Sequence, residues 1–315
     1  MDTPKIYIAG HRGMVGSTVL NAFRKKGYQH IITRSSDELD LRKQARVNRF
    51  ISTEKPDVII LAAARVGGIL ANDQYPYPFI YDNLSIQNNV INAAHKNNVA
   101  ELIFLGSSCI YPKEASQPLK EEYLLTGSLE PTNQWYAIAK IAGIKLCQAL
   151  RKQYGRKYVA LMPTNLYGPR DNFDLETSHV VPAMIRKFHE AKESGDHPVI
   201  LWGTGNPRRE LLHVNDLAKA VLFAVENQLS KSIYNIGTGQ DLTIKALARL
   251  IQDIVGHEGE IIWDKSKPDG TPRKVLDVSR IHAAGWHNEI GLEEGLRDTY
   301  KWFVKNKNQL KEVKI

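Results

Sequence analysis

The stretch Lys5-Ile-Tyr-Ile-Ala9, followed by Gly10-His-Arg-Gly13-Met-Val-Gly16 and an amphipathic segment over 17–26, predicts a strand, a glycine turn and a helix in succession. In such a unit the glycines let the backbone approach a pyrophosphate, and the first helical turn offers its free N–H groups. The spacing is G-x-x-G-x-x-G rather than G-x-G-x-x-G. Because the motif directly follows a strand near the start of the chain, it predicts the phosphate-binding opening of a dinucleotide fold.

Strand and helix patterns alternate behind this opening. The later strands are expected at 30–33, 58–61, 102–105 and 158–161, and the helices at 41–55, 79–97 and 134–154. Asp40 is expected to cap the first of these helices. The strands are almost entirely apolar, which is typical of a parallel sheet covered on both faces. The alternation without an internal repeat predicts an α/β fold with a doubly wound parallel (Rossmann) sheet.

The pattern changes at residue 170. Short helices are expected at 180–193 and 243–255, strands at 199–202 and 261–263, and a polar loop at 267–274. We interpret this part as a smaller α/β substrate-binding cap, with 211–216 and 233–237 returning to the main sheet. The expected division is a dinucleotide-binding domain of 1–169 plus 212–239, and a substrate-binding domain of 170–211 plus 240–315.

Composition narrows the kind of protein and partner. The 315 residues carry a net charge of +8 and 43% hydrophobic residues, without a membrane-length apolar run or a signal peptide, so we expect a cytoplasmic protein. Two cysteines and ten histidines show no metal-ligand spacing, so no metal is expected. The basic residues are spread out and no nucleic-acid-binding motif occurs. These features favour a phosphorylated small molecule over nucleic acid or membrane.

The end of the second expected strand indicates which cofactor binds. A dinucleotide fold usually places a carboxylate there for the ribose 2′-hydroxyl, but this chain has Thr33-Arg34-Ser35-Ser36. Arg34, together with Arg12 of the glycine loop and the nearby hydroxyls, is suited to a 2′-phosphate. The sequence therefore favours NADP over NAD. The alternative is that Arg34 is an exposed turn residue.

Tyr136 and Lys140 are four residues apart on an expected helix, so their side chains share one face. A nearby ammonium is expected to lower the pKa of the phenol, which suits a proton donor in the reduction of a carbonyl. Taken alone, the pair also fits a solvated helix face.

Several motifs in one order give a family resemblance. The glycine motif, Ser107, Tyr136-x-x-x-Lys140 and Asn165-x-Tyr-Gly-Pro169 resemble the extended short-chain dehydrogenases that modify nucleotide sugars. The resemblance extends to the GDP-L-fucose synthase family through Ala64-Arg-Val-Gly-Gly68, Gly106-Ser-Ser-Cys-Ile-Tyr-Pro112, Trp202-Gly-Thr-Gly205 and Ser266-Lys-Pro-Asp-Gly-Thr-Pro-Arg273, and covers nearly the whole chain. Ser36 stands where some members carry an arginine.

The resemblance implies a two-part reaction on GDP-4-keto-6-deoxy-D-mannose, with epimerisation at C3 and C5 and NADPH-dependent reduction at C4. A C4 ketone acidifies the hydrogens on both neighbouring carbons, so one base and one acid serve both positions. The implied base is Cys109 and the implied acid is His179. Ser107 would hydrogen-bond the C4 oxygen, Tyr136 would protonate it, and Lys140 would tune the phenol and hold the nicotinamide ribose. Cys147 is expected to be a small buried hydrophobic residue.

The resemblance also implies the binding residues and a homodimer through the helices 79–97 and 134–154. The expected cofactor-binding residues are Gly10, Arg12, Gly13, Met14, Val15, Gly16, Arg34, Ser36, Asp40, Leu41, Ala63, Leu105, Gly106, Lys140, Pro163, Asn165, Leu166 and His179. The expected binding residues for the GDP part of the substrate are Lys187, Trp202, Arg209, Asp269 and Lys274.

Two other functions remain open at this point. One is a different nucleotide-sugar 4-epimerase, reductase or dehydratase of the same fold, although the dehydratases carry an Asp-Glu pair where this chain has Ser108-Cys109. The other is a non-catalytic Rossmann protein that binds RNA or a partner through its basic surface, which the set Ser107, Tyr136 and Lys140 argues against.

Overall fold

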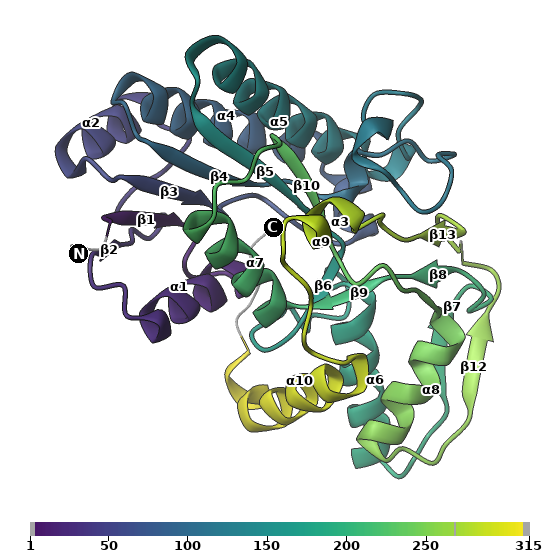
Figure 1. Cartoon of the computed structure of the whole chain (residues 1–315). Coiled ribbons are helices and arrows are strands. Elements are labelled where there is room, and N and C mark those ends of the chain that lie inside the picture. The colour runs from purple at the N-terminus through teal and green to yellow at the C-terminus, as the bar shows by residue number, and fades with distance from the viewer. Residues whose placement is uncertain (1–3, 268, 311–315) are drawn as a thin grey trace.

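A parallel sheet of six strands forms the centre of the chain. The computed structural model describes residues 4–267 and 269–310, so Pro268 of the expected polar loop lies outside the described residues. The strand order is β10-β5-β4-β3-β1-β2, and all neighbouring pairs are parallel (Figure 1). The strands are β1 (Ile6–Ala9), β2 (Ile31–Ile32), β3 (Val58–Leu61), β4 (Glu101–Leu105), β5 (Lys157–Pro163) and β10 (Ile233–Ile236). The expected doubly wound sheet is confirmed.

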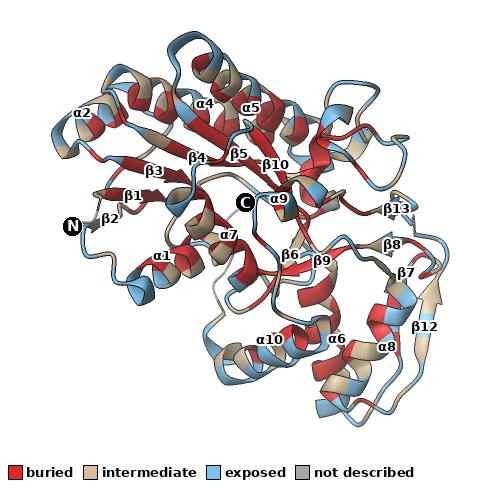
Figure 2. Ribbon diagram, in the orientation of Figure 1, coloured by how far each residue is buried: buried red, intermediate tan, exposed pale blue. Residues whose placement is uncertain are grey.

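Helices cover both faces of this sheet. In Figure 1, α2 (Gln44–Glu54), α4 (Pro76–Lys96) and α5 (Gln134–Tyr154) lie above it, and α1 (Met14–Lys26) and α7 (Val214–Glu226) lie below. The strands are buried along almost their whole length, which explains their apolar sequences (Figure 2). Chain order reverses between β1 and β3, and the carboxyl ends of strands at such a point form the ligand crevice of this architecture.

A second hydrophobic core lies beyond the carboxyl edge of the sheet. It is built from α6 (Val180–Glu193), α8 (Ile244–Val255) and α10 (Leu292–Asn306), with Phe188, Leu247 and Phe303 among its fully buried members (Figure 2). Short strands complete this part: β7 (Val199–Trp202) with β12 (Ile261–Asp264), and β8 (Arg208–Arg209) with β11 (Leu242–Thr243) and β13 (Arg273–Lys274). The expected smaller α/β part is therefore present.

Two expectations about local structure were wrong. β9 (Leu211–His213) does not return to the main sheet; it pairs with β6 (Asn165–Tyr167) in a separate two-stranded sheet, and only β10 joins the main one. Asp40 does not cap α2, which begins at Gln44. The Asp40 carboxylate instead accepts hydrogen bonds from the backbone and side chain of Arg42, because the chain turns once more before the helix.

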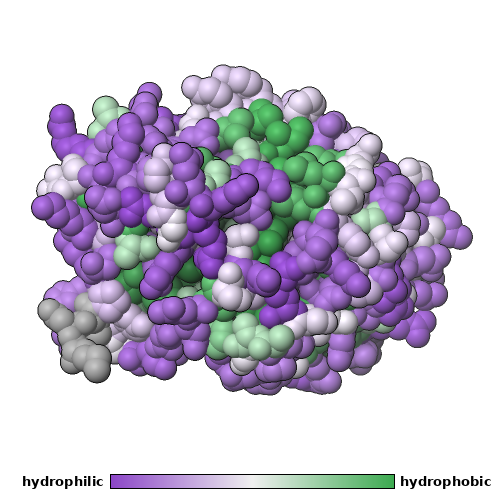
Figure 3. Space-filling view, turned by 45° about the horizontal axis from the view of Figure 1, so that its top comes forward, coloured by the Kyte–Doolittle hydropathy of each residue, from purple (hydrophilic) through white to green (hydrophobic). Residues whose placement is uncertain are grey.

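The remaining short elements connect the two parts. They are α3 (Ile69–Gln74), α9 (Ser279–Ala283) and the 3-10 helices η1 (Ser108–Ile110), η2 (Glu121–Tyr123), η3 (Pro131–Asn133) and η4 (Lys307–Gln309). Among the described residues, no helix has the length and apolar content needed to cross a bilayer. Figure 3, which turns the α4 and α5 side forward, shows apolar surface between hydrophilic areas.

Candidate active site

The glycine loop after β1 requires its glycines for steric reasons. Gly10 has a φ of +90°, and a Cβ there would lie 2.7 Å from the backbone nitrogen of Ala63. A Cβ on Gly16 would lie 2.1 Å from the carbonyl oxygen of Gly10. Gly13 precedes the first turn of α1, which contains no acidic residue. The loop therefore brings backbone and a helix N-terminus together without steric or electrostatic obstruction to an anion.

The other expected cofactor residues gather at the same edge of the sheet. Ala63 follows β3, Leu105 ends β4, Gly106 follows it, and Pro163 ends β5. Because parallel strands present their carboxyl ends at one edge, these positions lie along the crevice next to the glycine loop. The remaining expected residues of this edge are Leu166 and Asn165, whose side-chain amide donates to the Glu210 carbonyl over 2.9 Å.

Arg34, predicted to bind a 2′-phosphate, has partners within the protein. Its guanidinium donates to the carboxylate of Glu54 over 2.9 Å and to the Thr33 carbonyl over 2.8 Å, and it packs over the Phe50 ring. Arg34 is thus neither a bare turn residue nor an unpaired cation. Arg12 is exposed, and its contact with Asp37 is long, at 3.9 Å. Ser36 is exposed, and Leu41 is half-buried near the start of α2.

Tyr136 and Lys140 lie on the first turns of α5, on one face as expected. The Lys140 ammonium is 5.6 Å from the centre of the Tyr136 ring and donates to the Leu105 carbonyl over 2.7 Å. Burial lowers the pKa of Lys140 to about 8. The prediction that the pKa of Tyr136 is lowered was wrong. Burial raises this pKa, and the charge of Cys109 raises it further.

Ser107 and Cys109 face this pair from the end of β4. Ser107 caps η1: its hydroxyl accepts a hydrogen bond from the backbone N–H of Cys109 over 3.3 Å, which fixes both side chains relative to each other. Burial raises the pKa of the Cys109 thiol, while Lys274, the Ser107 hydroxyl and Lys140 act to lower it. Cys147 is fully buried in the main core, as expected.

His179 lies directly before α6, on the opposite part of the molecule from Cys109. The residue is partly exposed to solvent, but protein atoms lie around its side chain and partly desolvate it. That burial, together with the charge of Lys274, lowers the pKa of His179. Lys274 is half-buried on β13, and its charge acts on Cys109 as well. The charge of Lys274 therefore acts on both the expected thiol and the expected imidazole, and the charge of Cys109 acts on Tyr136.

The expected GDP-binding residues lie on α6, β7, β8 and β13 and in the loop before β13. Lys187 donates to the Ile200 carbonyl over 3.0 Å, and Trp202 is exposed with the Lys267 ammonium 5.6 Å from its ring centre. Arg209 is half-buried, and its guanidinium donates to the carbonyl of Arg208. Asp269 accepts hydrogen bonds from the backbone and hydroxyl of Thr204, both over 2.7 Å, so in this structure it shapes the turn after β7.

Known proteins resemble the chain over most of its length. Residues 6–237 match the model of the NAD dependent epimerase/dehydratase family. The chain belongs to this family. It is 54% identical to GDP-L-fucose synthase 1 of Arabidopsis thaliana over 96% of this chain and 94% of that protein, and 51% identical to GDP-L-fucose synthase of Escherichia coli K12 over 99% and 100%. A solved structure of MlghC, a GDP-mannoheptose C4 reductase from Campylobacter jejuni with NADP bound, superposes with a TM-score of 0.90 at 38% identity, covering 96% and 99%.

Some polar groups of this family member were not singled out from the sequence. The side-chain oxygens of Asn72, Asn133 and Ser178 are buried without a hydrogen-bond partner in the described part of the chain. Ser178 adjoins His179, and Asn133 precedes α5, which carries Tyr136. Asp171 also has an unpaired buried oxygen, and burial raises its pKa to about 7. Only their position beside recognised motifs could have indicated them, because burial without a partner is not visible in a sequence.

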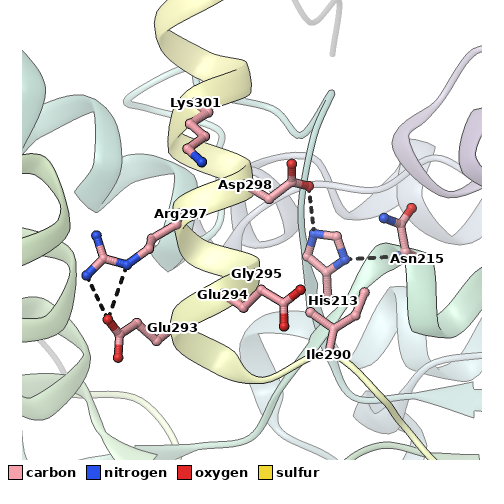
Figure 4. Close-up of a pocket in the computed structure, with 9 residues that line it drawn as sticks. All are labelled: His213, Asn215, Ile290, Glu293, Glu294, Gly295, Arg297, Asp298 and Lys301. Atoms are coloured by element: carbon pink, nitrogen blue, oxygen red, sulfur yellow. Dashed lines mark hydrogen bonds and ion pairs between the residues drawn. The ribbon is translucent and has the colours of Figure 1, made fainter.

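One large pocket of this epimerase/dehydratase family member lies away from these residues. It has a volume of about 710 Å³ beside α10, and its lining contains none of the expected site residues (Figure 4). Figure 4 shows His213 pointing toward Asp298, with 3.6 Å between the ring Nε2 and the carboxylate. Within the described residues, no group of three His, Cys, Asp or Glu side chains is arranged to hold a metal.

Proposed function

We propose that this protein converts GDP-4-keto-6-deoxy-D-mannose into GDP-L-fucose, by epimerisation at C3 and C5 and NADPH-dependent reduction at C4. The observation that carries the proposal is the closeness of three groups: Tyr136 and Lys140 share one face of α5, 5.6 Å apart, and the charge of Cys109 acts on both. A reductase alone needs the tyrosine and lysine. The thiol adds a base, and the similarity to two GDP-L-fucose synthases over nearly their whole length supports its use in epimerisation.

Epimerisation uses Cys109 as base and His179 as acid. The Cys109 thiolate removes the hydrogen from C3 or C5, forming an S–H bond while the C–H electron pair moves into an enolate whose charge rests on the C4 oxygen. His179 then delivers a proton to the same carbon from the other face. Burial makes the thiolate a stronger base and the imidazolium a stronger acid, since it raises the pKa of Cys109 and lowers that of His179.

Reduction uses the residues next to the C4 oxygen. The Ser107 hydroxyl donates a hydrogen bond to this oxygen as its negative charge develops, and Tyr136 protonates it. The raised pKa of Tyr136 keeps the phenol protonated and ready to donate at neutral pH. NADPH, when bound, supplies the hydride. Lys140 positions the nicotinamide ribose and stabilises the phenolate that forms.

The residues at the sheet edge fit an NADP molecule. The tight glycine turn and the N-terminus of α1 suit its pyrophosphate, with Met14 and Val15 in the first turn. Arg12 and Ser36 are exposed and accessible to the 2′-phosphate. Arg34 would join them by breaking its hydrogen bond to Glu54, or by binding the phosphate while keeping that bond. Asp40 and Leu41 would border the adenine. This assignment is consistent with the NADP bound to MlghC.

The outer residues fit the GDP part of the substrate. Lys187, Arg209 and Lys274 supply cations for a diphosphate, and the exposed indole of Trp202 suits stacking on a base. Asp269 is exposed beside them and accepts hydrogen bonds, as recognition of guanine N–H groups requires. We also propose that the unpaired oxygens of Asn133 and Ser178 accept hydrogen bonds from sugar hydroxyls.

The test is to mix the protein with NADPH and GDP-4-keto-6-deoxy-D-mannose in deuterated water. We expect NADPH to be oxidised and deuterium to enter the sugar at C3 and C5. Mass spectrometry and NMR of the sugar measure the deuterium. Oxidation without deuterium entry would make the protein a C4 reductase only. Deuterium entry without oxidation would make it an epimerase only.

We further propose a cytoplasmic homodimer made of two domains, 1–169 plus 212–239 and 170–211 plus 240–315. The location is supported by the use of NADPH and a nucleotide sugar. The division is supported by the second hydrophobic core, whose members all come from 170–211 and 240–315 except Tyr167. The dimer is proposed to form through α4 and α5. Exposed aromatic and aliphatic side chains on these helices support it, including Tyr77, Tyr81, Trp135 and Ile138.

A further inference from the structure

Residues 65–68, in the loop after β3, connect the main part of the molecule to the segment before His179. The backbone N–H of Gly68 donates a hydrogen bond to the Thr177 carbonyl over 3.0 Å. Thr177 is two residues before His179, which directly precedes α6 of the second hydrophobic core. The 65–68 loop itself follows a strand of the main core. The two parts are therefore joined by a direct hydrogen bond beside the proposed acid.

Gly68 permits this close approach because it has no side chain. A Cβ at this position would lie 2.9 Å from the carbonyl oxygen of Ser178 and 3.2 Å from that of Thr177. The backbone φ of Gly68 is −64°, which any residue adopts, so an added methyl would act through these contacts and not through backbone strain. The Ser178 carbonyl belongs to the peptide bond with His179. A methyl at residue 68 would therefore displace the backbone of His179 directly.

Two buried asparagines hold the 65–68 loop in place. From α4, the side-chain oxygen of Asn83 accepts the Arg65 N–H over 2.9 Å, and its amide donates to the Arg65 carbonyl over 3.0 Å. From α3, the amide of Asn72 donates to the carbonyls of Gly67 and Gly68 over 2.8 and 3.0 Å. The loop is therefore fixed to two helices at both of its ends.

Hydrogen bonds also order the segment that ends at His179. The Asp174 carboxylate accepts the N–H of Thr177 over 2.9 Å and its hydroxyl over 2.8 Å. The Asn172 amide donates to the same hydroxyl over 2.9 Å, and the Ser178 N–H donates to the Asp174 carbonyl over 3.0 Å. Because this segment is held so closely, a displacement at Thr177 is transmitted to His179 rather than absorbed.

The opposite side of the 65–68 loop lies next to the surroundings of Tyr136. A Cβ at Gly67 would lie 3.1 Å from the Phe79 ring, and this ring contacts the Tyr136 ring edge-to-face with 6.5 Å between centres. The helix α3 begins directly after the loop and packs against η3, which leads into α5. The loop therefore lies between the surroundings of the proposed phenol donor and the segment that carries the proposed acid.

We propose that the 65–68 loop is a fixed spacer within the site, and that Gly68 and Asn83 are positioning residues for His179. Gly68 sets how closely the backbone before His179 approaches, and Asn83 holds the loop on α4. Both act through His179 rather than on the sugar. The role rests on the proposed function, because it affects the reaction only if His179 is the acid of epimerisation. Proton transfer needs hydrogen-bond reach, so a small displacement of the imidazole is costly to the rate.

The first measurement follows His179 without any nucleotide sugar. The protein is prepared with isotope-labelled histidine, and the ring signal of His179 is assigned by NMR from its loss in His179→Gln. The signal is then recorded in the wild type, Gly68→Ala and Asn83→Leu. We expect both substitutions to shift it, because the first pushes the backbone before His179 and the second releases the loop.

Two substitutions are matched controls. Gly291 has an ordinary φ of −67°, and a Cβ there would have no contact within 4 Å among the described residues, so Gly291→Ala adds a methyl without displacement. Asn235 is a buried asparagine whose amide donates to the carbonyls of Leu119 and Asp277 over 2.9 and 3.0 Å, so Asn235→Leu removes a similar set of hydrogen bonds elsewhere. Both controls should leave the His179 signal in place, although Asn235→Leu should lower thermal stability.

The second measurement separates epimerisation from hydride transfer. Deuterium entry at C3 and C5 is measured with NADP, which cannot reduce the ketone, and hydride transfer is measured alone as NADP reduction by GDP-L-fucose in a single turnover. We expect Gly68→Ala and Asn83→Leu to lower deuterium entry about 100-fold, as a small misplacement of a catalytic group does. The hydride rate should stay at the wild-type value, because that step does not use His179.

An unmoved His179 signal in both loop variants would overturn the proposal, and so would unchanged deuterium entry in both. Equal loss of hydride transfer and deuterium entry would also overturn it, because general damage to the fold has that effect. A shifted His179 signal in the two controls would do the same. If the wild type shows no deuterium entry, the proposed function fails, and the NMR signal alone then supports or overturns the coupling of the 65–68 loop to His179.

Discussion

Cys109 and Tyr136 divide the proposed chemistry between them. Cys109 is buried and its backbone N–H donates to the Ser107 hydroxyl, whereas the Tyr136 phenol is half-buried and adjoins Lys140. The substitution Cys109→Ala should reduce deuterium exchange at C3 and C5 at least about 100-fold, the usual contribution of a general base. Tyr136→Phe should reduce NADPH oxidation by a similar factor and leave exchange measurable. The reverse pattern would exchange the two role assignments. Cys147→Ala is the control, because it removes a buried thiol that has no proposed role in catalysis.

The ionisation of Cys109 and His179 predicts the pH dependence of exchange. Exchange needs the thiolate and the imidazolium together, although burial raises the pKa of Cys109 and lowers that of His179 from their ordinary values, so the two pKa values lie on either side of neutral pH. Between these limits the product of the two populations is constant, because one rises as the other falls. We expect a flat profile that declines in acid through the His179 pKa and in alkali through the Cys109 pKa. A sharp maximum near neutral pH would contradict these directions.

Residue types and spacing predicted which residues form the candidate site, but not which other groups these side chains contact. The pair Tyr136 and Lys140 follows from helical spacing alone, and α5 carries it as expected. The partner of Arg34 could not be predicted, since Glu54 lies twenty residues further along the chain. The direction of the Tyr136 pKa also required the structure, because burial by distant segments raises it.

At the scale of elements, the glycine loop gives a prediction with a matched control. Gly16→Ala should lower NADPH affinity by about tenfold or more and destabilise the protein by about 1–3 kcal/mol, because the added methyl would overlap the Gly10 carbonyl, 2.1 Å away. At Gly13 the nearest atom is 3.6 Å away, which is ordinary contact, so Gly13→Ala should leave stability nearly unchanged. Thermal unfolding with and without NADPH measures both. Equal effects of the two substitutions would show that the steric explanation is wrong.

The helices were predicted more accurately than the connections between strands. The expected bounds 134–154 and 180–193 coincide with α5 and α6, whose apolar spacing and end signals are local. The pairing of β9 with β6 was missed because strands of two or three residues carry no pattern that identifies their neighbour. The start of α2 was missed because Asp40 is a plausible cap that the chain uses for a turn.

At the scale of the whole molecule, the proposed catalytic residues lie on elements of two different hydrophobic cores. The main core supports the glycine loop, Cys109 and Tyr136, whereas His179 begins α6 of the second core. The proposed base and the proposed acid therefore come from elements of different cores. Segments of the second part also bury themselves in the main core, since Leu276, Val278 and Ile281 pack there.

The surface of α4 and α5 predicts the oligomeric state. Tyr77 and Tyr81 are 67% and 53% exposed and stack on each other at 5.2 Å between ring centres, and Ile138 on α5 is 39% exposed. Solvated aromatic and aliphatic groups on two adjacent helices are suited to burial against the same helices of a second copy. The double substitution Tyr81→Glu and Ile138→Glu should therefore shift the protein from dimer to monomer in analytical ultracentrifugation.

Ile262→Glu provides the matched control for this prediction. This side chain is similarly exposed, at 41%, but lies on β12 of the second part, so the added charge should leave the dimer intact. The double variant should still fold, because its positions are solvent-exposed in the single chain, and its NADPH affinity should stay close to that of the wild type. If the wild type sediments as a monomer, the proposed dimer does not form. If the double variant remains a dimer, the interface lies elsewhere on the surface.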